Sequence, residues 1–161
     1  MRKNNKTFVI IFVIVAAGIV LLGYRSFVPS GGAGTVPCNN PAIPDSPNLH
    51  LHPQLTIIIN GEQVRIPANL GIEFAGCHRV LHTHDETGVI HIEPDFAGDF
   101  TLGQFFDLWG KPFSETQILD RVADEKHEII LTVNGEPSTE YENLLLKDKQ
   151  NVVIEYRGTS E

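Results

Sequence analysis

The feature that most constrains the fold is a short polar segment between two runs that carry three histidines. Residues 85–88 read Asp-Glu-Thr-Gly, which has the length and composition of a hairpin loop. A four-residue loop here places His82 opposite His91, with His84 two residues further along the first strand. Because the side chains of a strand alternate between its two faces, the three imidazoles share one face. A directly opposed pair lies about 5 Å apart at Cβ, so these rings can hold one divalent ion.

A second pair of histidines precedes this hairpin with the same spacing. His50 and His52 are two residues apart, so both rings share one face of an extended segment. Of the seven histidines in the chain only His127 lies outside residues 50–91. The alternative is that each is an ordinary histidine satisfied by hydrogen bonds, but the doubled pattern favours a metal site. The predicted ligands are His50, His52, His82, His84 and His91, with Asp85 and Glu93 as carboxylates that orient the rings.

The amino-terminal part predicts a membrane anchor. Residues 7–24 contain no charged residue, and at about 1.5 Å per residue they come close to spanning a bilayer core. More basic residues precede this segment than follow it, which keeps the amino terminus in the cytoplasm and exports the rest. A cleaved signal peptide is the alternative, but the apolar core is long and no Ala-x-Ala site follows it. We therefore expect a single-pass protein of the cell membrane with an extracytoplasmic carboxyl-terminal domain.

Composition divides the chain into three parts. Residues 1–27 hold the cytoplasmic end and the anchor, and residues 28–48, with five prolines and a Gly-rich run, indicate a linker. Residues 49–158 are the predicted extracytoplasmic metal-binding domain. All twenty acidic residues follow position 44, whereas eight basic residues follow Arg25, so the exported part carries a net charge of about −12. This charge argues against nucleic acid as a partner, and the sequence leaves a protein partner open.

Two cysteines, Cys38 and Cys77, lie on the predicted exported side. Thiols tend to be oxidised there, so a disulfide between them is our first interpretation. It closes a loop of about forty residues, which the chain-entropy model values at roughly 3–4 kcal/mol. The alternative makes Cys77 a thiolate ligand beside the histidines, which shifts the site towards zinc or cuprous copper.

Local signals predict the remaining elements. Asn60 and Gly61 between β-branched runs are typical of a two-residue hairpin turn, which pairs Ile57 with Val64. The capping-box pattern at residues 101–104 starts a helix that carries apolar residues at helical spacing as far as position 109. A short capped turn follows at residues 114–117, and strands are expected over 128–133 and 152–156.

This order of elements predicts an α+β fold, a small mixed sheet with one main helix. A hairpin, a helix and two further strands resemble the β-grasp, or ubiquitin-like, arrangement. The histidine-rich hairpin is then an insertion between the first hairpin and the helix. A small cupredoxin-like β-sandwich is the alternative, but it needs about seven strands, and we count about six.

Five motifs cover most of the predicted exported domain. They are His-x-His at 50–52, Cys77, His-Thr-His-Asp at 82–85, Gly-x-Ile-His-x-Glu at 88–93 and Thr-Leu-Gly-Gln-Phe-Phe-Asp-x-Trp-Gly at 101–110. As a set they resemble an uncharacterised family of small, exported, membrane-anchored proteins of archaea and bacteria. The resemblance implies export and anchoring but brings no activity with it.

Three kinds of function fit the predicted site. The first is an extracytoplasmic copper-handling protein that binds, stores or delivers the ion, since imidazole suits copper and zinc and copper(II) tops the divalent affinity order. The second is a metalloenzyme that uses zinc, copper or iron, with Glu93 or Asp85 as base, although no His-Glu-x-x-His signature is present. The third is a structural or partner-binding module with a stabilising metal. We expect binding rather than catalysis.

Overall fold

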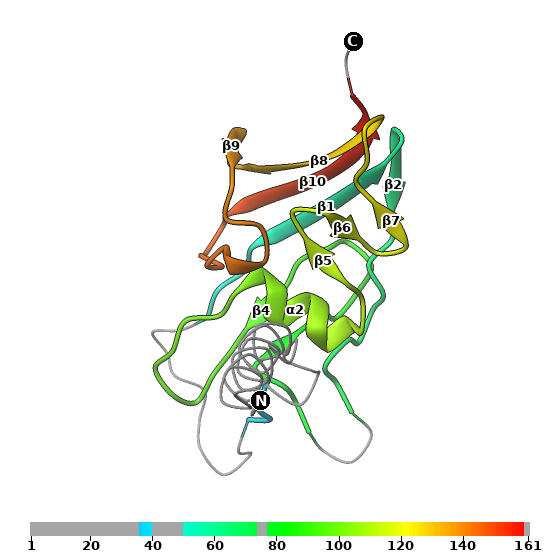
Figure 1. The fold of residues 1–161 in the computed structure, drawn as a ribbon. Coiled ribbons are helices and arrows are strands. Elements are labelled where there is room, and N and C mark those ends of the chain that lie inside the picture. Colours follow the sequence, from blue (N-terminus) through cyan, green and yellow to red (C-terminus); the bar gives the residue numbers. More distant parts are fainter. Residues whose placement is uncertain (1–35, 40–49, 74–76, 160–161) are drawn as a thin grey trace, which may run out of the picture. The chain divides into compact units, whose positions relative to one another are not determined.

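The computed structural model describes residues 36–39, 50–73 and 77–159 (Figure 1). All of them belong to one compact unit, Gly31–Glu161. The described residues form a mixed α+β fold with one α-helix and three sheets. The α+β class predicted from the sequence is therefore confirmed at this level.

The largest sheet has five strands in the order β2-β1-β10-β8-β9. Its strands are β1 (Gln54–Ile59), β2 (Glu62–Val64), β8 (His127–Val133), β9 (Glu136–Ser138) and β10 (Asn151–Gly158). The central pair, β1 and β10, is parallel, and the other neighbours are antiparallel. Alternate apolar residues of the central strands are buried, among them Leu55, Ile57, Leu131 and Ile154. These buried side chains lie on one face of the sheet, and this face forms the main part of the hydrophobic core.

Two Asn-Gly turns close the hairpins at the edges of this sheet. Asn60 and Gly61 have φ values of 52° and 85°, and Asn134 and Gly135 have 54° and 86°. Positive φ at both central residues matches the right-handed twist of the flanking strands, and Asn-Gly is the pair that best tolerates it. The predicted pairing of β1 with β2 at Ile57 and Val64 is confirmed.

The single described α-helix, α2 (Leu102–Trp109), has the predicted capping box. Thr101 Oγ1 accepts from the backbone N–H of Gln104 at 3.3 Å, and Gln104 Oε1 accepts from the backbone N–H of Thr101 at 2.8 Å. Gly110 ends the helix in the left-handed conformation, with φ 68°. The helix buries Leu102, Phe105 and Phe106.

Two small sheets complete the fold. β3 (Leu81–His82) pairs with β4 (His91–Ile92), and the pairing of His82 with His91 confirms the predicted register. A second small sheet contains β5 (Phe113–Ser114), β6 (Gln117–Ile118) and β7 (Arg121–Val122). The turn expected at residues 114–117 is the connection between β5 and β6, where Ser114 Oγ accepts from the N–H of Thr116 at 3.2 Å. A 3₁₀ turn, η2 (Tyr141–Asn143), leads towards β10.

The prediction of a membrane-spanning helix needs correction. A helix that crosses a bilayer needs about 20 apolar residues, whereas α2 has eight. In the part of the chain that the structure describes, no helix is long and apolar enough to cross a membrane. Residues 7–24, on which that prediction rested, lie outside the described residues, as does most of the predicted linker over 28–48.

Candidate metal centre

Three extended segments lie side by side and carry the histidines. Residues 89–93 form the middle segment, which pairs with 80–82 on one side and with 51–54 on the other. We call residues 50–54, 80–84 and 89–93 the histidine ladder. On the second side, Leu51 and Ile92 exchange backbone hydrogen bonds of 3.1 and 3.0 Å, and Gln54 bridges Val89.

The register of the histidine ladder brings the rings together. Leu51, Leu81 and Ile92 are aligned across the three segments, and the last two are fully buried. Because side chains alternate along each segment, the neighbours of these residues project from the opposite face. His91 therefore lies between His52 and His82, with ring centroids 4.7 and 5.3 Å away.

The rings of His84 and His50 complete the cluster. His84 lies 4.4 Å from His91 and 4.9 Å from His82, and His50 lies 4.7 Å from His52, between ring centroids. Ligand atoms within 4.8 Å of one another form two overlapping sets. The inner set is His82, His84, His91 and Glu93, and the outer set is His50, His52, His91 and Glu93. All five predicted histidine ligands are thus in one cluster.

Glu93 occupies the centre of this cluster rather than its periphery. Its Oε1 lies 2.7 Å from His50 Nε2 and 3.2 Å from His91 Nδ1, while Oε2 lies 3.7 Å from His82 Nε2. Burial raises the pKa of this carboxyl, but the nearby His82 and the hydrogen bond from His91 outweigh burial, so its pKa lies below the ordinary value. The sequence suggested that Glu93 orients rings from outside, whereas its position makes it a potential ligand.

His82 is the most deeply placed ring. Its Nδ1 lies 3.0 Å from the carbonyl oxygen of Arg79 and donates to it, which leaves Nε2 with a free lone pair. That Nε2 is buried and has no hydrogen-bond partner among the described residues. Burial lowers the pKa of His82 to about 4. The ring is therefore neutral at pH 7, which is the form that binds a metal ion.

The pKa of His91 also lies below its ordinary value. Burial lowers its pKa, and the hydrogen bond to Glu93 opposes this effect only in part. With Nδ1–H directed to Glu93, the other ring nitrogen is left as the metal-binding atom.

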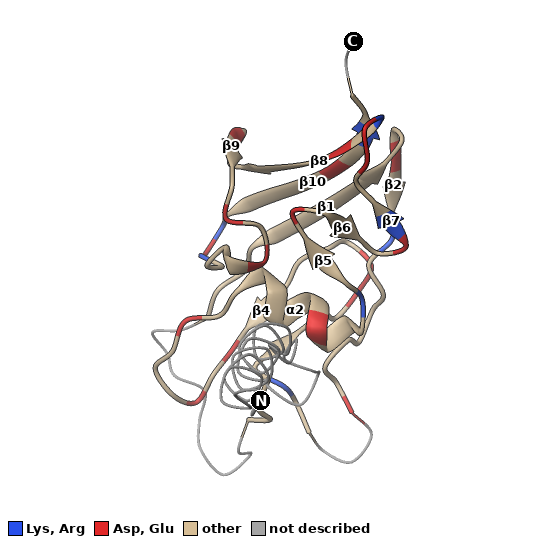
Figure 2. Cartoon of the chain, viewed as in Figure 1, with Lys and Arg blue, Asp and Glu red and all other residues tan. Residues whose placement is uncertain are grey.

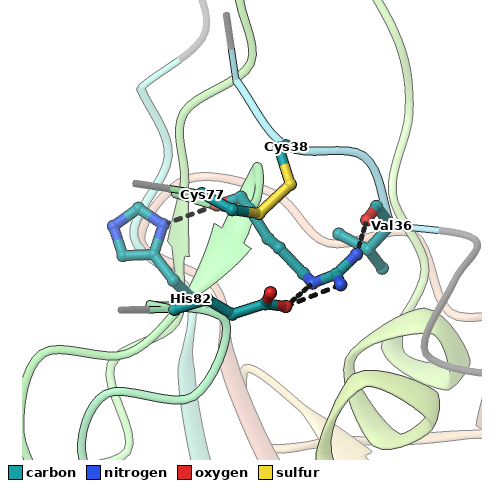
Figure 3. Close-up of a disulfide and its surroundings, with 6 residues drawn as sticks. Val36, Cys38, Cys77 and His82 are labelled. Atoms are coloured by element: carbon teal, nitrogen blue, oxygen red, sulfur yellow. Dashed lines mark hydrogen bonds and ion pairs between the residues drawn. A yellow bond between two sulfur atoms is a disulfide. The ribbon is translucent and has the colours of Figure 1, made fainter. Parts of the chain in front are cut away.

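A disulfide between Cys38 and Cys77 anchors the segment that leads into β3 (Figure 3). The two Cα atoms are 5.3 Å apart and 39 positions apart in sequence. Both sulfurs are used in this bond, so the alternative in which Cys77 is a thiolate ligand does not hold in this structure. The donor set of the site is imidazole and carboxylate.

The backbone around the disulfide fixes the partner of His82. Cys38 bridges Arg79, and the N–H of Val80 donates to the carbonyl of Pro37 at 3.0 Å. The Arg79 side chain donates to the carbonyl of Val36 at 2.6 Å and also pairs with Glu73 (Figure 3). These contacts hold the residue whose carbonyl sets the tautomer of His82. Sequence reasoning missed Arg79, because its role depends on backbone pairing with residues about forty positions away.

Asp85 makes its hydrogen bonds within its own loop rather than to a histidine ring. Its Oδ1 accepts from the backbone N–H of Thr87 at 2.9 Å and from the Thr87 hydroxyl. These two hydrogen bonds lower the pKa of Asp85. The residue therefore shapes the exposed loop of the hairpin. A different carboxylate, Asp148, accepts from the backbone N–H of His52 at 3.0 Å, and at 96 residues of separation no local signal could have found it.

The remaining histidines lie outside both sets of ligand atoms. His127 Nδ1 is 2.9 Å from Asp124 Oδ1, and its ring stacks on Tyr156 at 5.2 Å. His78 is exposed, and its ring centroid is 5.3 Å from that of His82. Replacement of either residue by alanine therefore serves as a control for replacement of a histidine in the cluster.

Comparisons of the chain with models of protein families, with curated proteins and with solved structures found no match. The resemblance to a family of exported proteins therefore stays a prediction. Function must be argued from the site.

Proposed function

We propose that this chain is an extracytoplasmic metal-binding protein that handles copper through the histidine ladder. The observation that carries the proposal is the buried Nε2 of His82, which has no hydrogen-bond partner among the described residues and faces Glu93 at 3.7 Å. A buried polar atom without a partner costs about 1–3 kcal/mol. A metal ion bound to this lone pair removes that cost.

The donor set favours copper, with zinc as the alternative. Imidazole suits both ions, and copper(II) binds most tightly of the divalent first-row metals. The disulfide removes thiolate from the donors and fits an oxidising compartment outside the cytoplasm.

Exposure of the outer rings supports handling of the ion rather than permanent storage in a closed site. The side chains of His50 and His52 are 53% and 40% exposed, whereas that of His82 is 1% exposed. An ion can therefore reach the cluster from solvent and exchange there. The chain is also acidic, with a formal net charge of −8, and Asp and Glu are spread over its loops and turns (Figure 2). Such an exterior raises the local concentration of cations.

A metalloenzyme is the second candidate, and one observation favours it. Asp148, which accepts from the backbone of His52, also lines a cavity of about 350 Å³ together with Leu144 and Gln150. None of its lining residues is a histidine, so Asp148 is the link between this cavity and the outer histidines. The copper-handling proposal needs no substrate in this cavity.

We also propose that the five-stranded sheet with α2 is a β-grasp fold. The support is the strand order β2-β1-β10-β8-β9, in which the first and last strands are the parallel central pair. The hairpin of β3 and β4 then interrupts the connection between the first hairpin and the helix, as the sequence suggested.

Elemental analysis tests the proposal of metal binding. The full chain, purified without a His tag, is incubated with copper(II), desalted and analysed for metal per chain. We expect bound copper in the wild type, a large loss in the double variant His82→Ala/His84→Ala, and wild-type content in His127→Ala. Absence of copper and zinc from the wild type would contradict the proposal. Turnover of a substrate that depends on the bound metal would favour the enzyme.

A further inference from the structure

We infer that the histidine ladder is a two-ion site in which the carboxylate of Glu93 bridges the two metal ions. The inference rests on the proposed function, because it concerns how many ions the cluster holds and which atoms hold them. It extends that function from one divalent ion to a pair.

The number of donors is the first reason. The cluster contains five imidazoles and one carboxylate, and its ligand atoms form two sets of four that share His91 and Glu93. One ion with four protein ligands would use a single set. Two neighbouring rings of the other set would then crowd against the site without binding the ion. Two ions use all six donors, three or four to each ion.

The orientation of Glu93 is the second reason. Its Oε1 faces the outer set, 2.7 Å from His50 Nε2, while its Oε2 faces the inner set, 3.7 Å from His82 Nε2. A carboxylate whose two oxygens face two different groups of imidazoles has the geometry of a bridge. Ions in two-metal sites lie about 3.5–4 Å apart, which is the spacing that one carboxylate can span.

The orientation of His91 determines how the imidazoles are shared between the two ions. Its Nδ1 is directed at Glu93 Oε1, at 3.2 Å, so only Nε2 is free to bind an ion. The closest ring to His91 is that of His84, at 4.4 Å. We assign His91 to the inner ion with His82 and His84. The outer ion then has His50, His52 and Glu93 Oε1, together with solvent.

Exposure supports this division into two positions of different character. The inner ion would be held by the buried His82, and the outer ion by two rings that are 40–53% exposed. The inner ion is therefore expected to exchange slowly, while the outer ion exchanges readily with solvent or with a metal acceptor. This arrangement suits a protein that retains one ion and delivers the other.

Copper stoichiometry tests the inference. The tag-free full chain is titrated with copper(II) sulfate, and native mass spectrometry counts the ions per chain. We expect two in the wild type and in His127→Ala, and one in His50→Ala/His52→Ala. Electron paramagnetic resonance of the wild type should show the half-field signal of two interacting copper(II) ions. Glu93→Gln should lose this signal and bind the second ion at least about tenfold more weakly, since replacement of even a residue that only supports a ligand typically costs that much metal affinity.

The possible failures are distinguishable. One copper in the wild type would overturn the inference and leave the proposed function intact. Two coppers in His50→Ala/His52→Ala would also overturn it, because the second ion would then bind elsewhere. An unchanged half-field signal in Glu93→Gln would overturn the bridge. No bound copper or zinc in the wild type would overturn the proposed function itself.

Discussion

The five-stranded sheet and the histidine ladder are held together by different interactions. In the sheet, β10 pairs with β8 over seven residue pairs and with β1 over six, and the paired strands bury a continuous apolar face. In the ladder, β3 and β4 share two pairs. The rest of the ladder is fixed by isolated bridges, a disulfide and side-chain contacts to distant backbone.

Because different interactions hold the sheet and the ladder, we expect the two regions to contribute differently to stability and to metal binding. Burial of apolar surface is the main favourable contribution to folding, and alternate residues of the central strands contribute to it. In the ladder, the buried Leu81 and Ile92 project from the face opposite the rings, and the ring-bearing face holds five imidazoles close to one carboxylate. Truncation of the sheet core should alter the stability of the unit and not copper affinity, whereas replacement of the ladder's imidazoles should alter copper affinity.

Truncation of the sheet core should have the largest effect on stability. Ile154 is fully buried in β10, so Ile154→Ala should lower the free energy of unfolding by about 2–5 kcal/mol through lost burial and a cavity. Denaturant titration of the metal-free protein measures this loss. Copper affinity under native conditions should not change. Weaker copper binding by the folded variant would show that the two regions are coupled.

Removal of the disulfide should affect both regions. The variant Cys38→Ser/Cys77→Ser avoids reductants, which would also reduce copper(II). The chain-entropy model gives a loss of roughly 3–4 kcal/mol for a loop of this length. Copper affinity should fall as well, because the backbone of Arg79, the partner of His82, loses its anchor. Denaturant titration and calorimetry measure the two effects.

The matched control for the disulfide variant is Thr101→Ala. It removes the capping box of α2 and should cost about 1 kcal/mol, with no change in copper affinity. If both variants weakened copper binding in proportion to their loss of stability, the specific role of the disulfide at the site would be wrong.

Acid should destabilise the metal-free protein through His82. Burial lowers the pKa of this ring to about 4 in the folded state, against 6.5 for the ordinary value. The unfolded state therefore binds the proton more readily, and the free energy of unfolding falls as the pH drops from 6.5 to 4. The loss is on the order of 3 kcal/mol. Unfolding titrations across this range should show a smaller slope for His82→Gln, and equal slopes would contradict the assignment.

The smallest effect is expected at Asp85. This carboxylate caps its own loop through Thr87, so Asp85→Ala should leave copper affinity nearly unchanged. Glu93→Gln, which removes a charge from the centre of the cluster, should weaken binding strongly. Calorimetry on the two variants compares the carboxylates directly. Equal losses would mean that Asp85 also acts on the metal.

Much of this architecture could be predicted because it depends on neighbouring residues. The length of the loop over 85–88 fixed the pairing of His82 with His91, and Asn60 with Gly61 fixed the first hairpin. The capping box of α2 was readable from four residues. In each case the chain supplies the constraint within a few positions.

The rest depends on contacts between distant segments. The pairing of Leu51 with Ile92 brings the two histidine pairs together, and no local pattern specifies it. The same holds for the contact of Asp148 with His52. A carboxylate beside metal-binding histidines usually orients their rings, so the sequence predicted that role for Glu93, whereas backbone pairing brings its carboxylate into the centre of the cluster. The membrane helix was inferred from hydropathy over residues that the structure does not describe.

Titration calorimetry of copper(II) into the tag-free full chain tests the central claim most directly. At pH 7 we expect tight binding that is lost or greatly weakened in His82→Ala and His91→Ala and retained in His78→Ala and His127→Ala. Below about pH 6 the affinity should fall, because protonated imidazole does not bind metal. Equal and unaltered binding by all four variants would contradict the site, and with it the proposed handling of copper.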